Sequence, residues 1–382
     1  MQLVAYGAQD IYLTGNPQIT FFKVVYRRHT NFSMEAIEQT INGTPNTSAR
    51  LTSIISRNGD LIYRIYHELS SLPVTGLFNI GAKLFDTIEL EIGGQKIDRI
   101  TGKWMEVWAE LTESNAGGLV GQANDTKGTT FQNMSCMGGV NAATSSLKQA
   151  LVPLPFWFCR NPGLALPLIA LQYHEVKLIT TLSSDASTST GLKTWVDYIY
   201  LDTDERRRFA QVSHEYLIEQ LQYFSDKKTI FELNFNHPVK ELIWTASQTA
   251  SGALGDFRFG NTGLESVKFQ LKLNGHDRFA ARTANYFTRT QVWEHHTGPG
   301  GLDASGSTGT TGNLNDTIAV YSFALKPEEH QPSGTCNFSR IDNAQLVVTG
   351  DATPVADDLT IYAINYNVLR IMSGMGGLAY SN

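Results

Sequence analysis

The chain alternates apolar and polar residues in many short stretches, most of them bounded by Gly, Asn, Asp or Pro. An alternation with a period of two is typical of a β-strand that turns one face to a core and one face to water. The clearest stretches are Ile88 to Ile92, Val196 to Tyr200 and Val267 to Leu273. Because such stretches recur along the chain, they predict an all-β protein built from antiparallel sandwiches.

Helical patterns are few and short. The best candidates are Lys103 to Leu111 and Asp204 to Gln211, and Asp202 or Thr203 is suited to cap the second. Four long stretches of low hydrophobicity lie between the strands, and their Gly, Ser, Thr and Asn content predicts loops carried by a β scaffold. These stretches are Thr112 to Lys148, Ser183 to Thr194, Thr245 to Gly263 and Glu294 to Asp316.

Four landmarks occur twice and in the same order, which indicates an internal duplication. The first is a strand that follows a turn, where Leu61 matches Leu242 at an offset of 181 residues. The others are a strand that ends in a tight turn, an aromatic run before a proline-containing turn, and an alternating strand. They lie at 88–94, 156–158 and 196–200, and again at 267–275, 321–323 and 361–366, at offsets of 179, 165 and 165. We therefore predict two copies of one β domain.

The tight turns of the two copies contain Gly93-Gly94 and Asn274-Gly275. Both pairs suit a primed hairpin turn, which requires positive φ at its central residues. We therefore assign hairpin-turn roles to Gly93, Gly94 and Gly275. The predicted organisation is an N-terminal arm over residues 1–26, a first domain over 27–212, a connector over 213–228 and a second domain over 229–382.

The hydrophobic content of the chain agrees with two folded domains, and its low charge argues against some classes of binding partner. Of the 382 residues, 42% are hydrophobic, which is enough apolar area to exclude intrinsic disorder. Only 17% are charged and the net charge is -6, so we expect no direct binding to nucleic acid. The most apolar stretch, Leu151 to Tyr173, contains four prolines and Arg160, which argues against a membrane-spanning helix. Three cysteines without metal or redox spacing indicate neither a disulfide scaffold nor a zinc site.

The sequence lacks the motifs of common enzymes. It has no His-x-His or His-Glu-x-x-His spacing, no phosphate-binding Gly-x-x-x-x-Gly-Lys motif and no Gly-x-Ser-x-Gly nucleophile elbow. We therefore predict no enzyme activity, no catalytic or metal-ligating residues and no cofactor. A jelly-roll hydrolase or oxygenase would need one of these spacings. A carbohydrate-binding sandwich, such as a lectin or attachment protein, remains the alternative to a structural protein.

Four segments resemble a known family. They read GAQDIYLTGNPQITFFK at residues 7–23, PGLALPLIALQYHEV at 162–176, PSGTCNFSRID at 332–342 and NYNVLRIMSG at 365–374. Together and in this order, they closely resemble the major capsid proteins of nucleocytoplasmic large DNA viruses, of the phycodnavirus and iridovirus kind. The resemblance extends from the first residues to the last. The chain departs from it in its loops, which look shorter than in some relatives.

The resemblance implies a structural protein of the virion. Its fold would be a double jelly roll, which is two tandem eight-stranded antiparallel β-sandwiches. Three chains would form a homotrimer with a pseudo-hexagonal outline, and these capsomers would tile an icosahedral shell around an internal membrane and a DNA genome. The resemblance further implies a late protein that is synthesised and assembled in the host cytoplasm and located in the virion capsid.

The resemblance also implies where the contacts lie. The N-terminal arm would lie at the capsomer base, against minor capsid proteins or neighbouring capsomers. The arm residues that we single out are Gln9, Asp10, Tyr12, Asn16, Pro17, Phe21 and Phe22. The loops Thr112 to Lys148 and Glu294 to Asp316 would form an outer crown, the place for contact with a host surface or a glycan. The alternative for the arm is a first strand packed on its own domain.

Overall fold

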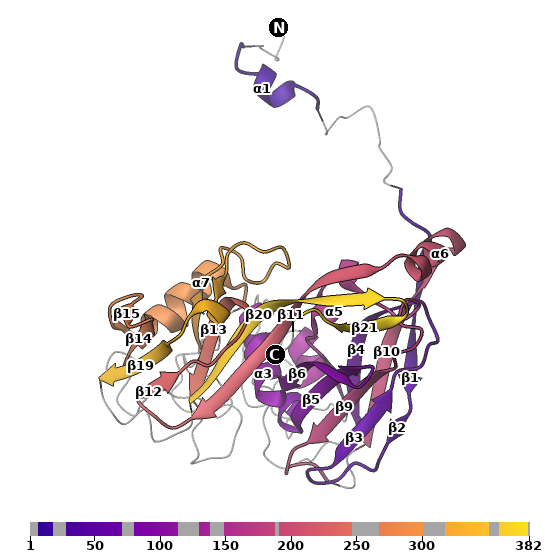
Figure 1. Cartoon of the computed structure of the whole chain (residues 1–382), viewed down its shortest axis with the longest axis horizontal. Helices are drawn as coiled ribbons and strands as arrows, with labels where there is room; N and C mark the ends of the chain where they lie inside the picture. Colours follow the sequence, from indigo (N-terminus) through magenta and orange to yellow (C-terminus); the bar gives the residue numbers. More distant parts are fainter. Residues whose placement is uncertain are drawn as a thin grey trace.

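Two β domains lie side by side, and an N-terminal segment extends away from them (Figure 1). The structure is a computed structural model that describes residues 7–17, 28–70, 80–113, 130–137, 149–187, 191–246, 267–298, 300, 318–350 and 359–380. Strands are the main regular elements of both domains, so the all-β prediction is confirmed. None of the helices within these ranges is long and apolar enough to cross a membrane.

The first domain is a sandwich of two antiparallel sheets. One sheet has the order β1-β10-β4-β7, formed by Phe32–Gln39, Gly191–Leu201, Leu61–Ser70 and Gln149–Pro153, and β8 (Leu166–Pro167) also pairs with β4. The other has the order β2-β3-β9-β5-β6, formed by Ile41–Asn42, Arg50–Ile54, Val176–Leu182, Phe85–Ile92 and Gln95–Thr101. On β5, Ile88, Leu90 and Ile92 are fully buried, as their alternation predicts.

The second domain is also a sandwich of two sheets. One has the order β11-β20-β13-β17, formed by His214–Asp226, Leu359–Met372, Pro238–Ala246 and Ile318–Ser322, with β18 (Cys336–Asn337) on β13 and β21 (Met375–Leu378) on β20. The other has the order β12-β19-β14-β15, formed by Ile230–Glu232, Ala344–Gly350, Val267–Leu273 and His276–Asp277, with β16 (Arg282–Thr283) on β14.

The two domains share one topology. The row β1-β10-β4-β7 corresponds to β11-β20-β13-β17, and the row β3-β9-β5-β6 corresponds to β12-β19-β14-β15. The remaining described strands, β2, β8, β16, β18 and β21, are additions of two to four residues. Each domain is therefore built on two rows of four main strands, and the prediction of a double jelly roll is confirmed.

Strand register shows the duplication at the level of residues. Tyr198 of β10 faces the first core, and Ala363 of β20, 165 positions later, faces the second. Tyr198 pairs with Ile62, whereas Ala363 pairs with Leu242. Leu242 therefore corresponds to Ile62, and its predicted match with Leu61 is wrong by one residue. A one-residue slip moves a side chain to the other face of a sheet, and Leu61 belongs to a separate small cluster.

Both predicted helices are present. In α3 (Gly102–Thr112), the side chain of Thr101 accepts a hydrogen bond from the Trp104 N–H, and in α6 (Thr203–Gln211) Asp202 caps the N-terminus. The other described helices are shorter. They are α1 (Ile11–Thr14), α2 (Ile80–Lys83), α4 (Thr130–Ser135), α5 (Trp157–Arg160), η1 (Pro162–Leu164), η2 (Tyr286–Thr290), α7 (Gln291–His295) and η3 (Phe338–Arg340).

The segment 213–228, which we predicted to be a connector, contains β11. This strand pairs with β20 without interruption from His214 to Asp226. The strand could not be recognised from the sequence, because its polar residues Glu219 and Gln220 are buried, at 5% and 3% exposure. Polar residues in this strand therefore do not mark a face that is turned to water. The correction makes this segment part of the second domain's sheet.

The sheet that contains β11 and β20 is buried between the two domains. Nine consecutive residues of β20, from Leu359 to Asn367, are buried. Ile361 and Ala363 belong to the second core, whereas Tyr362 and Ile364 pack in the first. Because both faces of the strand are covered, burial does not alternate along it, and the polar Thr360, Asn365 and Asn367 are buried with the apolar residues.

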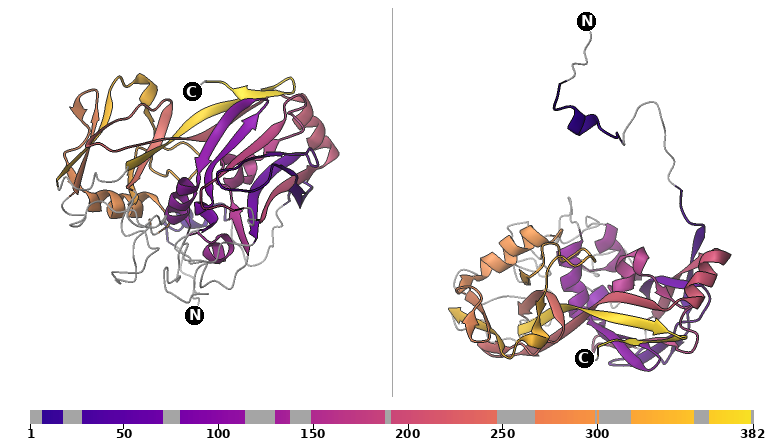
Figure 2. Two further views of the ribbon diagram at one scale, coloured as in Figure 1. Left: turned by 90° about the horizontal axis from the view of Figure 1, so that it is seen from below. Right: turned by 45° about the horizontal axis from the view of Figure 1, so that its top comes forward.

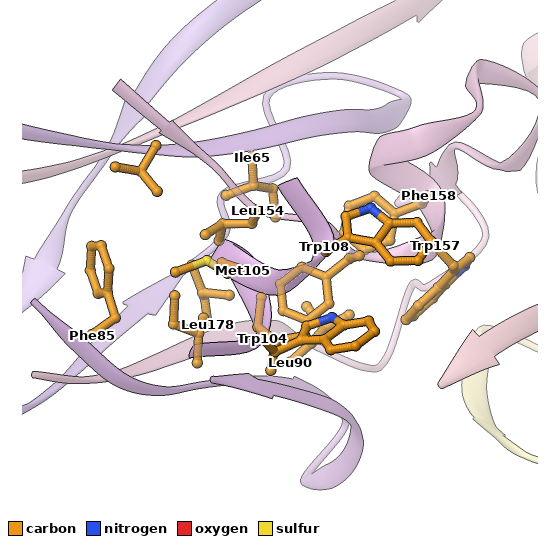
Figure 3. Packing of buried hydrophobic residues seen from close by; sticks show 14 of the residues in the cluster. Ile65, Phe85, Leu90, Trp104, Met105, Trp108, Leu154, Trp157, Phe158 and Leu178 are labelled. Carbon is orange, nitrogen blue, oxygen red and sulfur yellow. The ribbon is translucent and has the colours of Figure 1, made fainter. Parts of the chain in front are cut away.

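The first core reaches the junction between the domains through its helices. Figure 3 shows Trp104 and Trp108 of α3 close to Trp157 and Phe158 of α5, with Met105 beside Leu154. The Trp104 ring lies 5.0 Å from the ring of Tyr362 on β20. The helices of the first domain therefore hold the second domain in place.

Candidate assembly surfaces

The described part of the N-terminal arm is exposed. Ile11, Tyr12 and Leu13 of α1 are 62%, 89% and 83% exposed, and the segment stands away from both domains (Figure 1; Figure 2, right). Asp10 stabilises the turn, because its carboxylate accepts a 2.7 Å hydrogen bond from the Gly7 N–H. Residues 7–17 are thus a short helical turn with apolar side chains in water, and they are not a strand of the first domain.

The other arm residues divide between described and undescribed parts of the chain. Gln9, Asn16 and Pro17 are exposed beside α1. Phe21 and Phe22 lie outside the described residues, as do most of the predicted loops 112–148, 245–263 and 294–316. The crown therefore stays a prediction.

The predicted turn glycines lie at the tips of equivalent hairpins. Gly93 and Gly94 have φ of 58° and 84°, and Asn274 and Gly275 have φ of 52° and 77°. These are the positive values that a primed turn requires. Gly93 has a second constraint, because a Cβ there would lie 2.2 Å from Nδ1 of His174, whereas nothing lies within 4 Å of such an atom at Gly94 or Gly275.

A buried ion cluster lies at the junction of the domains. The guanidinium of Arg160 on α5 is 2.7 Å from the carboxylate of Glu219 on β11, and the ammonium of Lys240 on β13 is 2.8 Å from the same carboxylate. Burial alone would raise the pKa of Glu219, but Lys240, His330 and Arg160 together lower it to about 2. Glu219 is therefore ionised at neutral pH and joins the two domains.

Arg160 is also held by its own domain. Its guanidinium stacks 4.2 Å from the centre of the Trp108 ring and donates hydrogen bonds to the carbonyl oxygen of Pro155. The arginine therefore reaches Glu219 in a fixed geometry, which lowers the entropy cost of the ion pair.

Backbone contacts extend the junction along β6 and β11. The Leu221 N–H donates a 3.1 Å hydrogen bond to Oδ1 of Asp98, and the side-chain amide of Gln220 donates to the carbonyl oxygen of Ile97. Burial raises the pKa of Asp98 to about 6, although the Leu221 and Arg99 N–H groups and Arg160 oppose this shift. The edge of the second domain's sheet is thus closed by β6 of the first.

A second buried cluster lies inside the second domain. The His296 ring lies between two carboxylates, with Nε2 3.0 Å from Glu241 and Nδ1 3.1 Å from Glu328. Burial lowers the pKa of His296, but Glu241 and Glu328 outweigh this effect and raise it to about 9. His296 is therefore an imidazolium at neutral pH, and its ring nitrogens are both taken up by carboxylates.

Two faces outside the junction carry exposed apolar side chains. The β1 face has Phe32 and Met34, at 50% and 47% exposure, and the α7 face has Trp293 and Leu325, at 82% and 77%. In Figure 1, β1 lies at the right-hand end of the body, whereas α7 belongs to the domain on the left. We name these two faces as candidate contact surfaces because each exposes more than one large apolar side chain.

Two family models match consecutive parts of the chain. A model described as "Major capsid protein N-terminus" matches residues 20–202, and one described as "Large eukaryotic DNA virus major capsid protein" matches residues 205–377. The major capsid protein of Pyramimonas orientalis virus is 55% identical to the chain, over 100% of this chain and 99% of the relative. The chain belongs to the major capsid proteins of large eukaryotic DNA viruses.

Further relatives of this major capsid protein include the one from Paramecium bursaria Chlorella virus 1, which is 42% identical over 100% of this chain and 99% of the relative. That alignment extends over 461 positions against 382 residues here, so the relative has insertions with respect to this chain. A solved structure titled "PBCV-1 virus capsid, quasi-atomic model" aligns with a TM-score of 0.76 and 38% identity, over 95% of this chain and 100% of that one.

The residues of the two buried clusters were missed by sequence reasoning. Glu219, Lys240 and His296 have no motif, because their partners are distant in the sequence. Arg160 was noted only as a charge inside an apolar stretch. Arg160 directly follows an aromatic run, within an apolar stretch between two prolines. This position was a usable signal, because a charged side chain in such a stretch is buried only if it is paired.

Proposed function

We propose that this major capsid protein forms a homotrimer with a pseudo-hexagonal outline, and that the trimers tile an icosahedral shell around an internal membrane and a DNA genome. The observation that supports this proposal is the duplicated sandwich with a buried junction between its copies. Three chains with two similar domains each supply six similar wedges, and a threefold ring of heterologous contacts closes.

The test is the mass and shape of the purified protein. Native mass spectrometry should give three times the chain mass of 42.2 kDa, and electron micrographs should show particles with a hexagonal outline. A monomer at micromolar concentration, without hexagonal particles, would refute the proposal.

The N-terminal arm is proposed to act at the base of the capsomer. Its support is the exposed apolar turn Ile11–Thr14, which stands away from the folded domains. In the assembled virion, minor capsid proteins or neighbouring capsomers would cover these side chains. Assembly would take place in the host cytoplasm, and the crown loops would face the outside of the particle.

The carbohydrate-binding alternative finds no support in the described residues. The groove between β6 and β11 has a volume of about 750 Å³, and its lining contains the aromatic side chains of Tyr223, Phe224 and Phe235. The guanidinium of Arg99 covers the Tyr223 ring at 4.9 Å from its centre, and the rings of Phe224 and Phe235 pack on each other at 5.6 Å. The relatives are structural proteins, and no enzyme activity is proposed.

A further inference from the structure

One histidine of the first domain is buried between the two sheets of its sandwich. His67 on β4 is fully buried, and Nε2 of its ring lies 3.1 Å from the hydroxyl oxygen of Thr180 on β9, in the opposite sheet. Nδ1 lies 3.0 Å from the hydroxyl oxygen of Thr194, the residue that pairs with His67 on β10. The ring also stacks on Phe85, with 5.1 Å between the ring centres. The imidazole thus bridges the two sheets inside the core.

These contacts suit the neutral ring. A neutral imidazole has one N–H donor and one acceptor nitrogen, and a threonine hydroxyl can serve either of them. Protonation would add a positive charge, which two hydroxyls and a phenyl ring do not neutralise in a buried place. Burial accordingly lowers the pKa of His67 to about 4, although a hydrogen bond to the Lys193 backbone opposes this shift. His67 is therefore neutral at pH 7.

The charged side chains of the surrounding strands lie outside this part of the core. Glu68 follows His67 on the opposite face of β4, where its carboxylate accepts a 2.6 Å hydrogen bond from the Trp195 ring. Lys83 of the neighbouring α2 lies 3.7 Å from Asp185. None of the other charged residues on β4, β5, β9 and β10 is buried; they are Arg64, Asp86, Glu89, Glu91, Lys177, Lys193 and Asp197.

The other titratable side chains on the core face of β10 are two tyrosines. The hydroxyl of Tyr198 donates to the carbonyl oxygen of Ser56, and that of Tyr200 donates to the carboxylate of Glu35. No charged side chain of the described residues contributes to the pKa of His67. Within this part of the chain, a protonated His67 would therefore have no counter-ion.

The equivalent place in the second domain is occupied by apolar residue types. Leu359 lies 165 positions after Thr194, and it pairs with Ala246 on β13 as Thr194 pairs with His67 on β4. This offset is the one that relates the core residues of β10 and β20. Ala246 is therefore the counterpart of His67, and Leu359 is the counterpart of Thr194.

The third member of the cluster has an apolar counterpart as well. Thr180 pairs with Ile88 on β5, and Val348 pairs with Phe269 on β14. Ile88 and Phe269 differ by 181 positions, which is also the offset between the last glycines of the two hairpin turns. Val348 and Leu359 both belong to the second core. The duplicated fold can thus fill these positions with apolar residues, and the buried histidine belongs to the first copy alone.

We propose that His67, with Thr180 and Thr194, forms an acid-sensitive element that loosens the first domain, and not the second, as the pH falls below about 6. The unfolded chain takes up a proton at the usual value of 6.5, which the folded core rejects. The resulting penalty is absent above this pH and grows as the pH falls toward 4. In a capsid subunit, acid would then open the first domain while the second remains folded. The inference goes beyond the proposed function and does not depend on the trimer.

The test compares the two domains of the purified protein by hydrogen exchange. His67→Gln keeps a hydrogen-bonding side chain that cannot be protonated. Between pH 7 and 4.5, the protection of wild-type amides in β4, β9 and β10, corrected for intrinsic exchange, should fall by about 50-fold. Protection in β13, β19 and β20 should change much less. In His67→Gln, the excess fall in the first domain should disappear.

A second variant covers the case in which glutamine disturbs the packing. His67→Ala, Thr180→Val and Thr194→Leu together give the first domain the residues of the second, and this triple variant should also lose the excess fall. His29→Gln is the matched control, because His29 is an exposed histidine of the same domain, and it should behave like the wild type.

Three results would overturn the proposal. A wild-type protein without an excess fall in the first domain would show that it has no acid-sensitive element. An excess fall that persists in both His67 variants would assign the effect to other groups. Equal falls in both domains that vanish in His67→Gln would refute the restriction to the first domain. None of these results bears on the proposed trimer, which is tested by the mass of the assembly.

Discussion

The two edge strands β1 and β11 hold the same place in the two domains but have opposite surroundings. Six of the eight residues of β1 are exposed, whereas only two of the thirteen residues of β11 are. The buried strand carries the charged Glu219, and the open strand carries Phe32 and Met34. Within one duplicated fold, the covered edge is therefore bound by ions and hydrogen bonds inside the chain. The open edge instead carries apolar side chains that are about half exposed.

Glu219→Gln should break the covered edge and have the largest effect. The change leaves the fully buried ammonium of Lys240 without its counter-ion, which should lower the free energy of unfolding by about 3–5 kcal/mol. Glu215→Gln on the same strand is the control, because the side chains of Glu215 and its partner Arg370 are 58% and 50% exposed. This change should lower the free energy of unfolding by less than about 1 kcal/mol. Chemical denaturation measures both, and equal losses would show that the junction does not depend on the buried pair.

The pH dependence of the free energy of unfolding should distinguish the His296 cluster from the Glu219 cluster. The pKa of His296 is raised to about 9, so its contribution is complete below the unfolded value of 6.5 and is lost as the pH rises through 9. The pKa of Glu219 is lowered to about 2, so its contribution is lost only in acid, below 4.5. Stability should fall by up to about 3 kcal/mol between pH 6.5 and 9. His296→Gln should flatten this slope, and an unchanged slope in the variant would contradict the assignment.

Valine substitutions at the hairpin turns should show how far the duplication extends. Gly94→Val and Gly275→Val both force a β-branched residue into positive φ without a clash, and each should cost about 1–3 kcal/mol. Gly93→Val should cost more, because the His174 ring stands in the way of the new Cβ. The melting temperatures from thermal unfolding rank the stabilities of the three variants. Equal stability of all three variants and the wild type would contradict the equivalence of the turns.

Deletion of residues 1–23 should have the smallest effect on stability. The described arm residues are exposed, so the melting temperature and the trimer should be nearly unchanged, while incorporation of the protein into shells should fall sharply. Calorimetry measures the melting temperature, and an assembly assay in infected cells measures incorporation into shells. A variant that no longer folds would show that the arm is part of the first domain's core.

Local features were predictable from the sequence. The alternation at Ile88, Leu90 and Ile92 follows from one buried sheet face, and the turns at Gly94 and Gly275 need only their own backbone geometry. The two short helices were also found, because their caps and apolar positions lie within a few residues of each other. Among the exposed apolar surfaces, the sequence located the arm, but it singled out neither the β1 face nor the α7 face.

Features that depend on distant partners were not predictable. The strand β11 was taken for a connector because its buried polar residues broke the alternation. Glu219 is buried only because Arg160, 59 residues earlier, and Lys240 reach the same carboxylate. The match of Leu61 with Leu242 was off by one because the sequence contains no record of pairing register.

The sequence by itself determined the β class, the duplication and the family, because alternation, order of landmarks and long shared segments are local or linear properties. Only the tertiary structure decided which copy of the duplicated sheet is covered within the chain and which is left open. The physical reason is that a β edge is completed by whatever lies beside it in space. The first domain lies beside β11, and the described residues leave Phe32 and Met34 of β1 half exposed.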